Sequence, residues 1–551
     1  MKQEKKFIII FLGVTLLLLS MSPLHSLEKK DPLTVAESSD FTATSRCSDV
    51  MNFIRELQEK TSLFRVETLC VSPEGREVPL LVIGQPVPSS PLALNHDKRA
   101  VLYIQANIHA GEVEGKEASL MLARDILLQE KPPYLDKLVI LIAPIFNADG
   151  NEKINPNNRR RQAGPEKGVG VRYNGQNLDL NRDGMKLESP EVQGLVRNVL
   201  NKWDPFLLVD CHTTNGSYHQ EPVTYIWPLN PNGDLPLIEY MREKMMPSIN
   251  KNLKQKYDVL SVPYGNFMDY RDPGKGWRPS GPQPRYITNY IGLRNRMAIL
   301  NENYSYADYK TRVLGCYYFL HSILEYCHAH TDEITQLIRQ ADQKTIQRGL
   351  HPSEKDTIAV EYDLQPLKEK VTVLGYEMEV IEKEGSRPQI RRTDKSKAYT
   401  VPFFTDFVPK RSVSFPSAYL IPTADPEIIH KLLQHGLLVE KLTKPIKLEV
   451  ESFRITEITG AKRLYQGHRM NSVKGEYNLE EKEFPAGTLF ISTAQPLANV
   501  AAYLLEPESD DGLLVWNFFD RYVVPQWGRG ALPYPVYKLL KPANLVKERV
   551  K

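Results

Sequence analysis

The sequence predicts an α/β fold, because strand-like and helix-like segments alternate along its first part. An apolar, β-leaning run at 100–106 is followed by a helical pattern at 114–124. Further strand-like runs lie at 137–144, 206–215 and 292–304, and a strongly apolar helix is predicted at 307–330. From about residue 354 the pattern changes to short strand-like runs separated by Pro and Gly. We therefore expect an α/β part followed by a smaller, strand-rich part.

The remaining elements follow from local patterns. A short amphipathic helix is predicted at 49–60, and the strands at 64–72 and 78–83 are separated by the turn sequence PEGR. Ser189 and Pro190 are typical of a helix start, which predicts a helix at 189–201. Two long loops, at 155–175 and 263–292, are rich in Gly, Pro, Asn and Arg, and long loops in compact domains are often functional.

Length and charge bound the possible roles. A chain of 551 residues is too long for one ordinary core, so two domains are expected. A net charge of +3 gives no electrostatic basis for binding nucleic acid. The segment 504–520 combines acidic and aromatic residues, and we interpret it as a solvated turn followed by a buried aromatic strand.

The N-terminus has the pattern of an export signal. Lys2, Lys5 and Lys6 precede the apolar run 7–19, and small or polar residues follow it. We predict a signal peptide at 1–26 and a secreted or periplasmic protein. The alternative is a retained N-terminal anchor, although the run is short for a membrane span. No other stretch is apolar enough to cross a bilayer.

The five cysteines are too few and too scattered for a disulfide framework. Cys47 and Cys70 form one conceivable bridge in an oxidising compartment. Cys211 falls inside a predicted buried strand and is expected to pack as a small apolar residue.

Polar, metal-binding side chains follow two of the predicted strands. His109 and Glu112 come after the strand 100–106, and His212 lies at the end of the strand 206–215. Ligands bind at the carboxyl ends of strands in open α/β sheets. Two imidazoles and one carboxylate are a typical ligand set of catalytic zinc, which keeps a fourth position open. The alternatives are a solvated surface turn for His109 and Glu112, and His219 in place of His212.

Several motifs in this order resemble the zinc carboxypeptidase family, peptidase family M14. They are HAGE at 109–112, NADG at 147–150, NRRRQ at 158–162, LDLNR at 178–182, the later His212, and Glu302 in NEN. The resemblance extends over about 66–326. It implies a mixed α/β sheet with helices on both faces, and one Zn²⁺ per chain held by His109, Glu112 and His212.

The resemblance also implies catalytic and substrate-binding residues. Glu302, at the end of an apolar strand, is the candidate general base. Asn181 and Arg182 match the pair that grips the C-terminal carboxylate of a peptide, and Arg suits such a two-pronged contact.

Arg159 is the candidate for a second arginine of the cleft. The oxyanion-stabilising Arg of the family would fall near Gln162, which departs from the pattern and leaves Arg161 or Arg159. Tyr290, with Tyr286 as the alternative, is the candidate for the family's mobile tyrosine.

The predicted organisation has five parts: a signal peptide at 1–26, a flexible lead-in at 27–48, the catalytic domain at 49–335, a linker at 336–353, and a strand-rich domain of unknown role at 354–551. The predicted function is a zinc-dependent metallocarboxypeptidase-like hydrolase, which cleaves a peptide or amide bond near a free C-terminal carboxylate. A zinc acyl-amino-acid deacylase and a catalytically silent protein that binds peptides or cell-wall termini are the alternatives. The oligomeric state is left open.

Overall fold

The computed structural model describes residues 31–550 except 382–388, 526, 529 and 531. The expected signal peptide at 1–26, like its alternative as an anchor, lies outside the described residues. Within the described residues, no helix is both long enough and apolar enough to cross a membrane.

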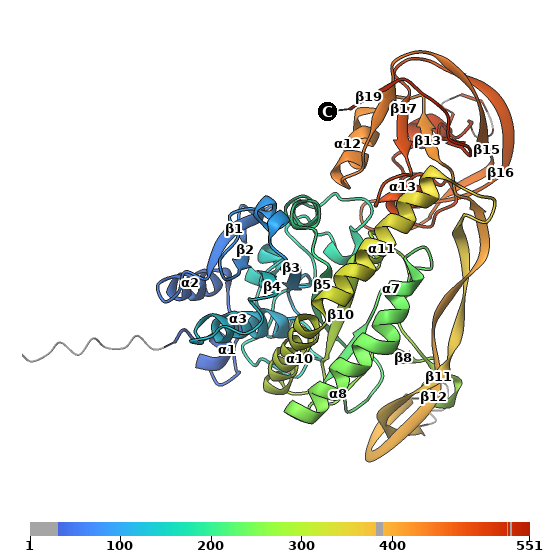
Figure 1. Ribbon diagram of the computed structural model, residues 1–551. Helices are drawn as coiled ribbons and strands as arrows, with labels where there is room; N and C mark the ends of the chain where they lie inside the picture. The colour runs from blue at the N-terminus through green and yellow to red at the C-terminus, as the bar shows by residue number, and fades with distance from the viewer. Residues whose placement is uncertain (1–30, 382–388, 526, 529, 531, 551) are drawn as a thin grey trace, which may run out of the picture.

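An eight-stranded mixed sheet forms the centre of the first part, in the order β1-β2-β4-β3-β5-β10-β6-β7 (Figure 1). The central strands β4, β3, β5 and β10 run parallel, whereas β1 and β2 pair antiparallel with their neighbours, and β6 pairs antiparallel with β10 and parallel with β7. The strands are β1 Phe64–Val71, β2 Glu77–Ile83, β3 Ala100–Ala106, β4 Leu138–Ala143, β5 Leu207–Thr214, β6 Val223–Ile226, β7 Ser261–Pro263 and β10 Met297–Tyr304.

Helices cover both faces of this sheet because its strands are apolar on both sides, as expected for buried parallel strands. One face packs against α2 Cys47–Gln58, α3 Glu114–Leu127, α8 Met246–Tyr257 and α10 Tyr309–Ala329. The other packs against the helical stretch from α5 Pro190–Gly194 to α6 Asn201–Trp203, and against α9 Ile287–Leu293. The remaining helices here are α1 Val35–Ser38, α4 Ala148–Glu152 and α7 Leu235–Tyr240.

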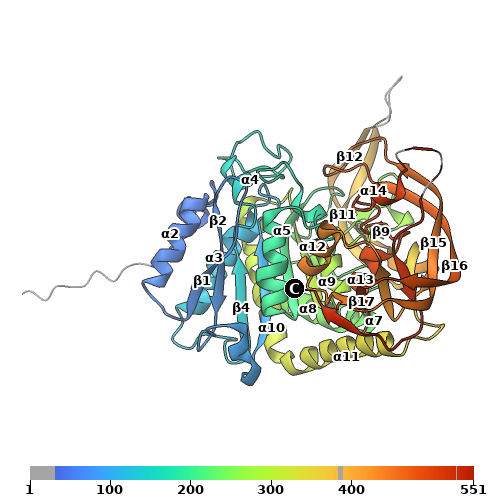
Figure 2. The same cartoon turned by 90° about the horizontal axis from the view of Figure 1, so that it is seen from above.

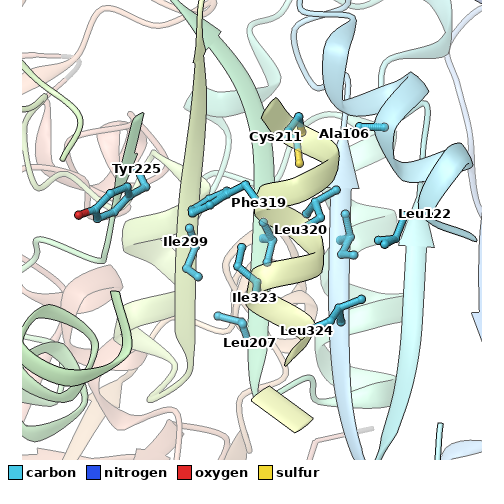
Figure 3. Close-up of a cluster of buried hydrophobic side chains, with 14 of the residues drawn as sticks. Ala106, Leu122, Leu207, Cys211, Tyr225, Ile299, Phe319, Leu320, Ile323 and Leu324 are labelled. Carbon is cyan, nitrogen blue, oxygen red and sulfur yellow. The ribbon is translucent and has the colours of Figure 1, made fainter. Parts of the chain in front are cut away.

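The core between α10 and the sheet is closely packed. Figure 3 shows Phe319, Leu320 and Ile323 of α10 packed against the sheet that carries Leu207 of β5 and Ile299 of β10. Each such side chain contributes about 1.5–3 kcal/mol on full burial. Gly115 lets α3 approach β5 closely, because a Cβ there would lie 2.4 Å from the Cβ of Cys211. The two strands that carry candidate site residues, β5 and β10, therefore have a rigid support.

The second part consists of two further sheets. The long strands β11 Thr357–Ile381 and β12 Gln389–Ser414 form a hairpin that joins β8 Asn266–Phe267 and β9 Trp277–Arg278 (Figure 1). A seven-stranded sheet contains β13 Ala418–Ile421, β14 Glu440–Leu442, β15 Ile446–Gly460, β16 Asn471–Phe484, β17 Leu489–Ser492, β18 Tyr537–Leu539 and β19 Lys547–Arg549. Helices α12 Pro426–Gln434, α13 Ala498–Leu505 and α14 Asp520–Val523 accompany it. From above, this part lies beside α5 and α9 (Figure 2).

The described part of the expected lead-in is ordered by a buried carboxylate. Glu117 of α3 is fully buried and accepts hydrogen bonds from Thr44 Oγ1 at 2.8 Å and from the Ser45 backbone N–H at 2.7 Å. A buried charge without such partners would be costly. Residues 34–45 therefore fold against α3 instead of forming a flexible segment.

The region expected to be a linker is mostly helical. Helix α11, Thr331–Leu350, follows α10 directly and buries Ile334, Ile338 and Ala341. It runs from the α10 layer to α13 of the second part (Figure 1). The polar composition that suggested a linker belongs to the exposed face of this helix.

Cys47 and Cys70 are both free thiols, so the conceivable bridge between them is absent. The Cys47 thiol donates to the Ala148 backbone oxygen at 3.5 Å, whereas Cys70 lies in β1 against α5. Burial, with the nearby Glu152 carboxylate, raises the pKa of Cys47 to about 12. Cys211 is buried in the core, as expected.

Candidate active site

The candidate site forms at the carboxyl ends of β3, β5 and β10. Strands β5 and β10 are parallel, and His212 is the register partner of Glu302. The turn after β3 is shaped by Asn107, whose φ of 65° lies in the left-handed region that Asn tolerates. Its side-chain amide donates to the backbone oxygens of Ala110 and Glu112. This turn directs His109 and Glu112 toward His212.

Three buried side chains meet there. His109 Nδ1 lies 3.1 Å from Glu112 Oε1, and His212 Nδ1 lies 2.9 Å from Glu112 Oε2. The two Nδ1 atoms are 3.2 Å apart, and one ligand atom of each residue lies within 4.8 Å of the others. Two imidazole nitrogens this close are favourable when they share a proton or a cation. Two histidine nitrogens and one carboxylate fit zinc, so this donor set suits a His₂Glu site.

Each histidine of the cluster contacts a second carboxylate through its Nε2 atom. His109 Nε2 lies 3.0 Å from Asp179 Oδ1, and His212 Nε2 makes an ion-pair contact of 2.8 Å with Asp210 Oδ2 that is poorly aligned for a hydrogen bond. Carboxylates in this position orient metal-binding imidazoles and set their tautomer. Both rings therefore present Nδ1 to the centre of the cluster.

The charges around the cluster shift its pKa values. Burial alone would raise the pKa of Glu112, but the charges of His109 and Arg159 and hydrogen bonds from both histidines hold it well below its usual range. Burial alone would lower the pKa of His212, but Asp210 and Glu112 raise it well above its usual value. The carboxylates of Glu112 and Asp210 thus favour a positive charge at the centre of the cluster.

Glu302 lines the same cavity as His109 and Glu112. Within the described part of the chain, its carboxylate forms no hydrogen bond or ion pair. Burial raises the pKa of Glu302 to about 8, and the Glu112 carboxylate adds to this effect. A divalent cation bound nearby would lower this pKa again, because it favours the ionised form. Glu302 can therefore take up and release a proton.

Two arginines approach the cluster. Arg159 donates to Glu112 Oε1 at 2.8 Å and to the Thr213 backbone oxygen at 3.0 Å. Arg172 donates from Nε to Asp179 Oδ2 at 2.7 Å, and its Nη1 lies 3.9 Å from Glu112 Oε1. Both line the cavity. Arg172 was not identified from the sequence, because counting from the NADG turn led to Gln162.

The cavity has a volume of about 560 Å³. Asn181, Arg182 and Tyr286 line one side, and the Arg182 guanidinium lies 4.5 Å from the centre of the Tyr286 ring. Asn181 Oδ1 accepts from the Ile287 backbone N–H at 2.9 Å, which ties this pair to the start of α9. Apolar side chains line another side, namely Ile226, Trp227, Leu229 and Leu300.

Tyr290 lies elsewhere, contrary to the sequence-based expectation. It is fully buried inside α9, and its hydroxyl contacts His435 Nδ1 at 2.7 Å. Tyr286 borders the cavity instead, because it is the N-cap residue before α9 and its extended backbone directs its ring differently from that of Tyr290. His219, the alternative ligand, stacks on Tyr304 with ring centres 3.8 Å apart and is outside the ligand cluster.

The remaining candidates from the NRRRQ segment lie at the cavity edge. Gln162 donates to the Gly111 backbone oxygen at 3.2 Å, and Arg161 is exposed at the rim. Asp179 and Asp210 are the other site residues that the sequence analysis missed. Both have a signal in hindsight, since Asp179 lies inside the LDLNR motif and Asp210 precedes His212 by two residues on the same face of β5.

Comparisons with known proteins agree with this geometry. Residues 50–205 match the family model of the zinc carboxypeptidases, peptidase family M14. Carboxypeptidase 2 of Trichophyton rubrum is 23% identical over 521 residues, which cover 90% of this chain and 89% of that protein. Carboxypeptidase 2 of Trichophyton equinum is 23% identical over 489 residues, 85% of this chain and 81% of that protein.

Among solved structures, the metallo-carboxypeptidase from Burkholderia cenocepacia is similar at 17% identity and a TM-score of 0.37, covering 52% of this chain and 69% of that one. The acyl-amino-acid deacylase alternative is not favoured, because the matching family model and the curated relatives are carboxypeptidases. Residues 50–205 thus match the zinc carboxypeptidases, peptidase family M14, and the family match and the curated relatives together support a zinc-dependent, carboxypeptidase-like hydrolase.

Proposed function

We propose that the protein binds one zinc ion through His109, Glu112 and His212 and removes residues from the C-terminal end of peptides. The observation that carries this proposal is the buried cluster of two Nδ1 atoms and one carboxylate beside a cavity that His109, Glu112 and Arg182 line. When bound, zinc polarises a carbonyl group and acidifies water.

The residues around the cluster supply the rest of the chemistry. Glu302 accepts a proton from water and passes it to the leaving amine, because its carboxylate is free in the cavity. Arg172 is the candidate for stabilising negative charge on the carbonyl oxygen, since it donates to Asp179 only through Nε, whereas both Nη atoms of Arg159 already donate to Glu112 and Thr213.

The free carboxylate of the substrate binds at Asn181 and Arg182. Arg182 is held by stacking on Tyr286, so little side-chain freedom is lost when it binds a carboxylate. This contact makes the proposed enzyme an exopeptidase, because a peptide bond far from the C-terminus offers no carboxylate there.

We also infer the organisation and location of the protein. Residues 49–335 form the catalytic domain and 354–551 a second domain, joined by α11. The basic and apolar pattern of 1–26 supports export as a secreted or periplasmic enzyme.

The test combines metal content with peptide hydrolysis. We expect about one zinc per chain in the wild type, and its loss in His109→Ala and in His212→Ala. The matched control is His219→Ala, which should keep its zinc because His219 lies outside the cluster. Glu302→Gln should keep its zinc and lose hydrolysis by a factor of about 10² to 10⁴.

Other outcomes would contradict the proposal. A folded wild-type protein that takes up no zinc would exclude the metal site. Zinc binding with no hydrolysis of any peptide that has a free C-terminus would leave a binding protein, which was the silent alternative.

A further inference from the structure

A tight turn of the C-terminal region reaches the active site. The backbone N–H of Tyr465 donates to the His468 oxygen at 2.8 Å, and the N–H of His468 donates back to the Tyr465 oxygen at 3.0 Å. The two residues between them have positive φ angles, 51° at Gln466 and 83° at Gly467. Two-residue hairpin turns need this conformation, but glutamine rarely adopts it. Folding alone would favour Asn or Gly at position 466.

The side chain of Gln466 explains its presence. Its Oε1 accepts a hydrogen bond from the backbone N–H of Asp179 at 2.8 Å, across 287 positions of sequence. Asp179 in turn contacts His109 Nε2 at 3.0 Å and the backbone N–H of Asn181 at 3.1 Å. It also accepts from Arg172 Nε at 2.7 Å. One residue thus links the metal cluster to the segment that holds the carboxylate-binding pair.

The turn itself is fixed on both sides. The Tyr465 ring stacks on Trp516 with ring centres 6.2 Å apart, and the guanidinium of Arg285 lies 5.6 Å from the centre of the Tyr465 ring. His468 Nε2 contacts Glu188 Oε1 at 2.8 Å. Gln466 is therefore presented to Asp179 from a rigid support.

We propose that Gln466 is a positioning residue of the active site, through which the C-terminal region fixes Asp179 and, through it, His109 and the Asn181–Arg182 pair. This inference rests on the proposed function, because it assigns His109 to the zinc and Arg182 to the substrate carboxylate. It gives the C-terminal region a role in activity beyond folding.

The test uses Gln466→Asn in the full chain. Asparagine favours the left-handed conformation, so the turn is kept or stabilised, but its side chain is one methylene too short to reach Asp179. We expect an unchanged or higher melting temperature together with zinc affinity about 10-fold weaker, as is typical when an outer partner of a metal-binding histidine is disturbed. Zinc affinity is measured by competition with a chelator, independently of activity. We also expect KM for a peptide with a free C-terminus to rise more than kcat falls.

Three further variants test the same inference. Gln466→Met keeps the length of the side chain without the acceptor and should reproduce the loss of zinc affinity. Arg463→Ala is the matched control, because Arg463 is exposed in the same connection and should change neither quantity. In an Asp179→Ala background, Gln466→Asn should cause no further loss of zinc affinity, since both act through Asp179.

The inference fails if Gln466→Asn keeps zinc affinity and KM within twofold of the wild type, or if its loss adds fully to that of Asp179→Ala. A wild-type protein that neither binds zinc nor cleaves peptides would instead overturn the proposed function, and this inference with it.

Discussion

Arg182 is the residue on which exopeptidase specificity depends in the proposed mechanism. Its Nη1 donates to the Asn181 backbone oxygen at 2.7 Å, and its guanidinium stacks on Tyr286, so it is ordered before substrate arrives. We expect Arg182→Ala to lower kcat/KM for peptides with a free C-terminus by at least about 30-fold, because an unpaired carboxylate costs about 2–5 kcal/mol.

The control for Arg182→Ala is a substrate that lacks the free carboxylate. Steady-state kinetics on the same peptide with an amidated C-terminus should give equal, low rates for wild type and variant. An equal loss on both substrates would indicate that Arg182 supports the fold instead of binding the carboxylate.

Glu191 is a buried carboxyl group whose protonation affects stability. It accepts from Asn174 Nδ2 at 3.1 Å, and its Oε1 has no partner within the described residues. Burial raises the pKa of Glu191 to about 7. Between the unfolded pKa and about 7, the folded state keeps a proton that the unfolded state has released. The free energy of unfolding therefore falls as pH rises through this window, by up to roughly 3 kcal/mol.

The variant Glu191→Gln should remove this pH dependence. The melting temperature of this variant, measured by circular dichroism, should rise relative to that of the wild type between pH 5 and pH 8. Glu56→Gln, at an exposed position of α2, is the control. A pH profile parallel to that of the wild type would show that Glu191 is ionised in the folded protein.

At the scale of elements, we expect β6 and β10 to determine which terminal side chain of the substrate is preferred. Ile226 and Leu300 are register partners on these strands, and with Trp227 and Leu229 they line one wall of the cavity. An apolar wall favours an apolar side chain by about 1–3 kcal/mol per well-placed group. We expect peptides that end in Leu or Phe to be cleaved about 10-fold or more faster than those that end in Lys or Glu.

Leu300→Asp tests this wall. It should lower kcat/KM for the Leu-ending peptide by about 10- to 100-fold. The difference in kcat/KM between the Leu-ending and the Lys-ending peptide should therefore become smaller. Leu300→Val, which keeps the wall apolar, should have a small effect, and zinc content should be unchanged in both. A wild type that prefers basic or acidic termini would show that the side chain binds at another wall.

At the scale of the whole molecule, the two parts share buried polar contacts. Asp511 is fully buried and lies 2.8 Å from Arg285 Nε, in the loop that leads to Tyr286. From the sequence, Asp511 is expected in a solvated turn before an aromatic strand. In the structure this segment is a series of turns, and Arg285 also lies over the Trp516 ring. The acidic and aromatic residues of 504–520 thus form an internal contact between the parts.

Because of this contact, we expect the chain to unfold in one cooperative transition in calorimetry. Arg285→Met leaves Asp511 buried without its partner, which costs about 3–5 kcal/mol, and should shift the whole transition to lower temperature. Lys474→Ala removes an exposed ion pair with Glu457 and should change it little. Two transitions, of which Arg285→Met moves only one, would contradict this coupling.

Sequence patterns were most informative where the chain is locally determined. The strands before His109 and His212 and the helix α3 follow from apolar runs and spacing, since period and polarity reflect burial on the two sides of a strand. Tyr290 and Tyr286 could not be distinguished, because only the orientation of α9 decides which ring borders the cavity. The polar stretch of α11 suggested a linker, because its buried face is narrow.

The sequence by itself determined the α/β class, the order of the motifs, and the side chains that meet at the strand ends. These depend on residue type and on strand and helix periods, which are local properties. Only the tertiary structure decided which groups support the site residues from outside. Asp210 contacts His212, Asp179 contacts His109, and Gln466 accepts a hydrogen bond from Asp179. Contacts between residues 287 positions apart leave no periodic trace in the chain, since they arise only when two separately folded surfaces pack together.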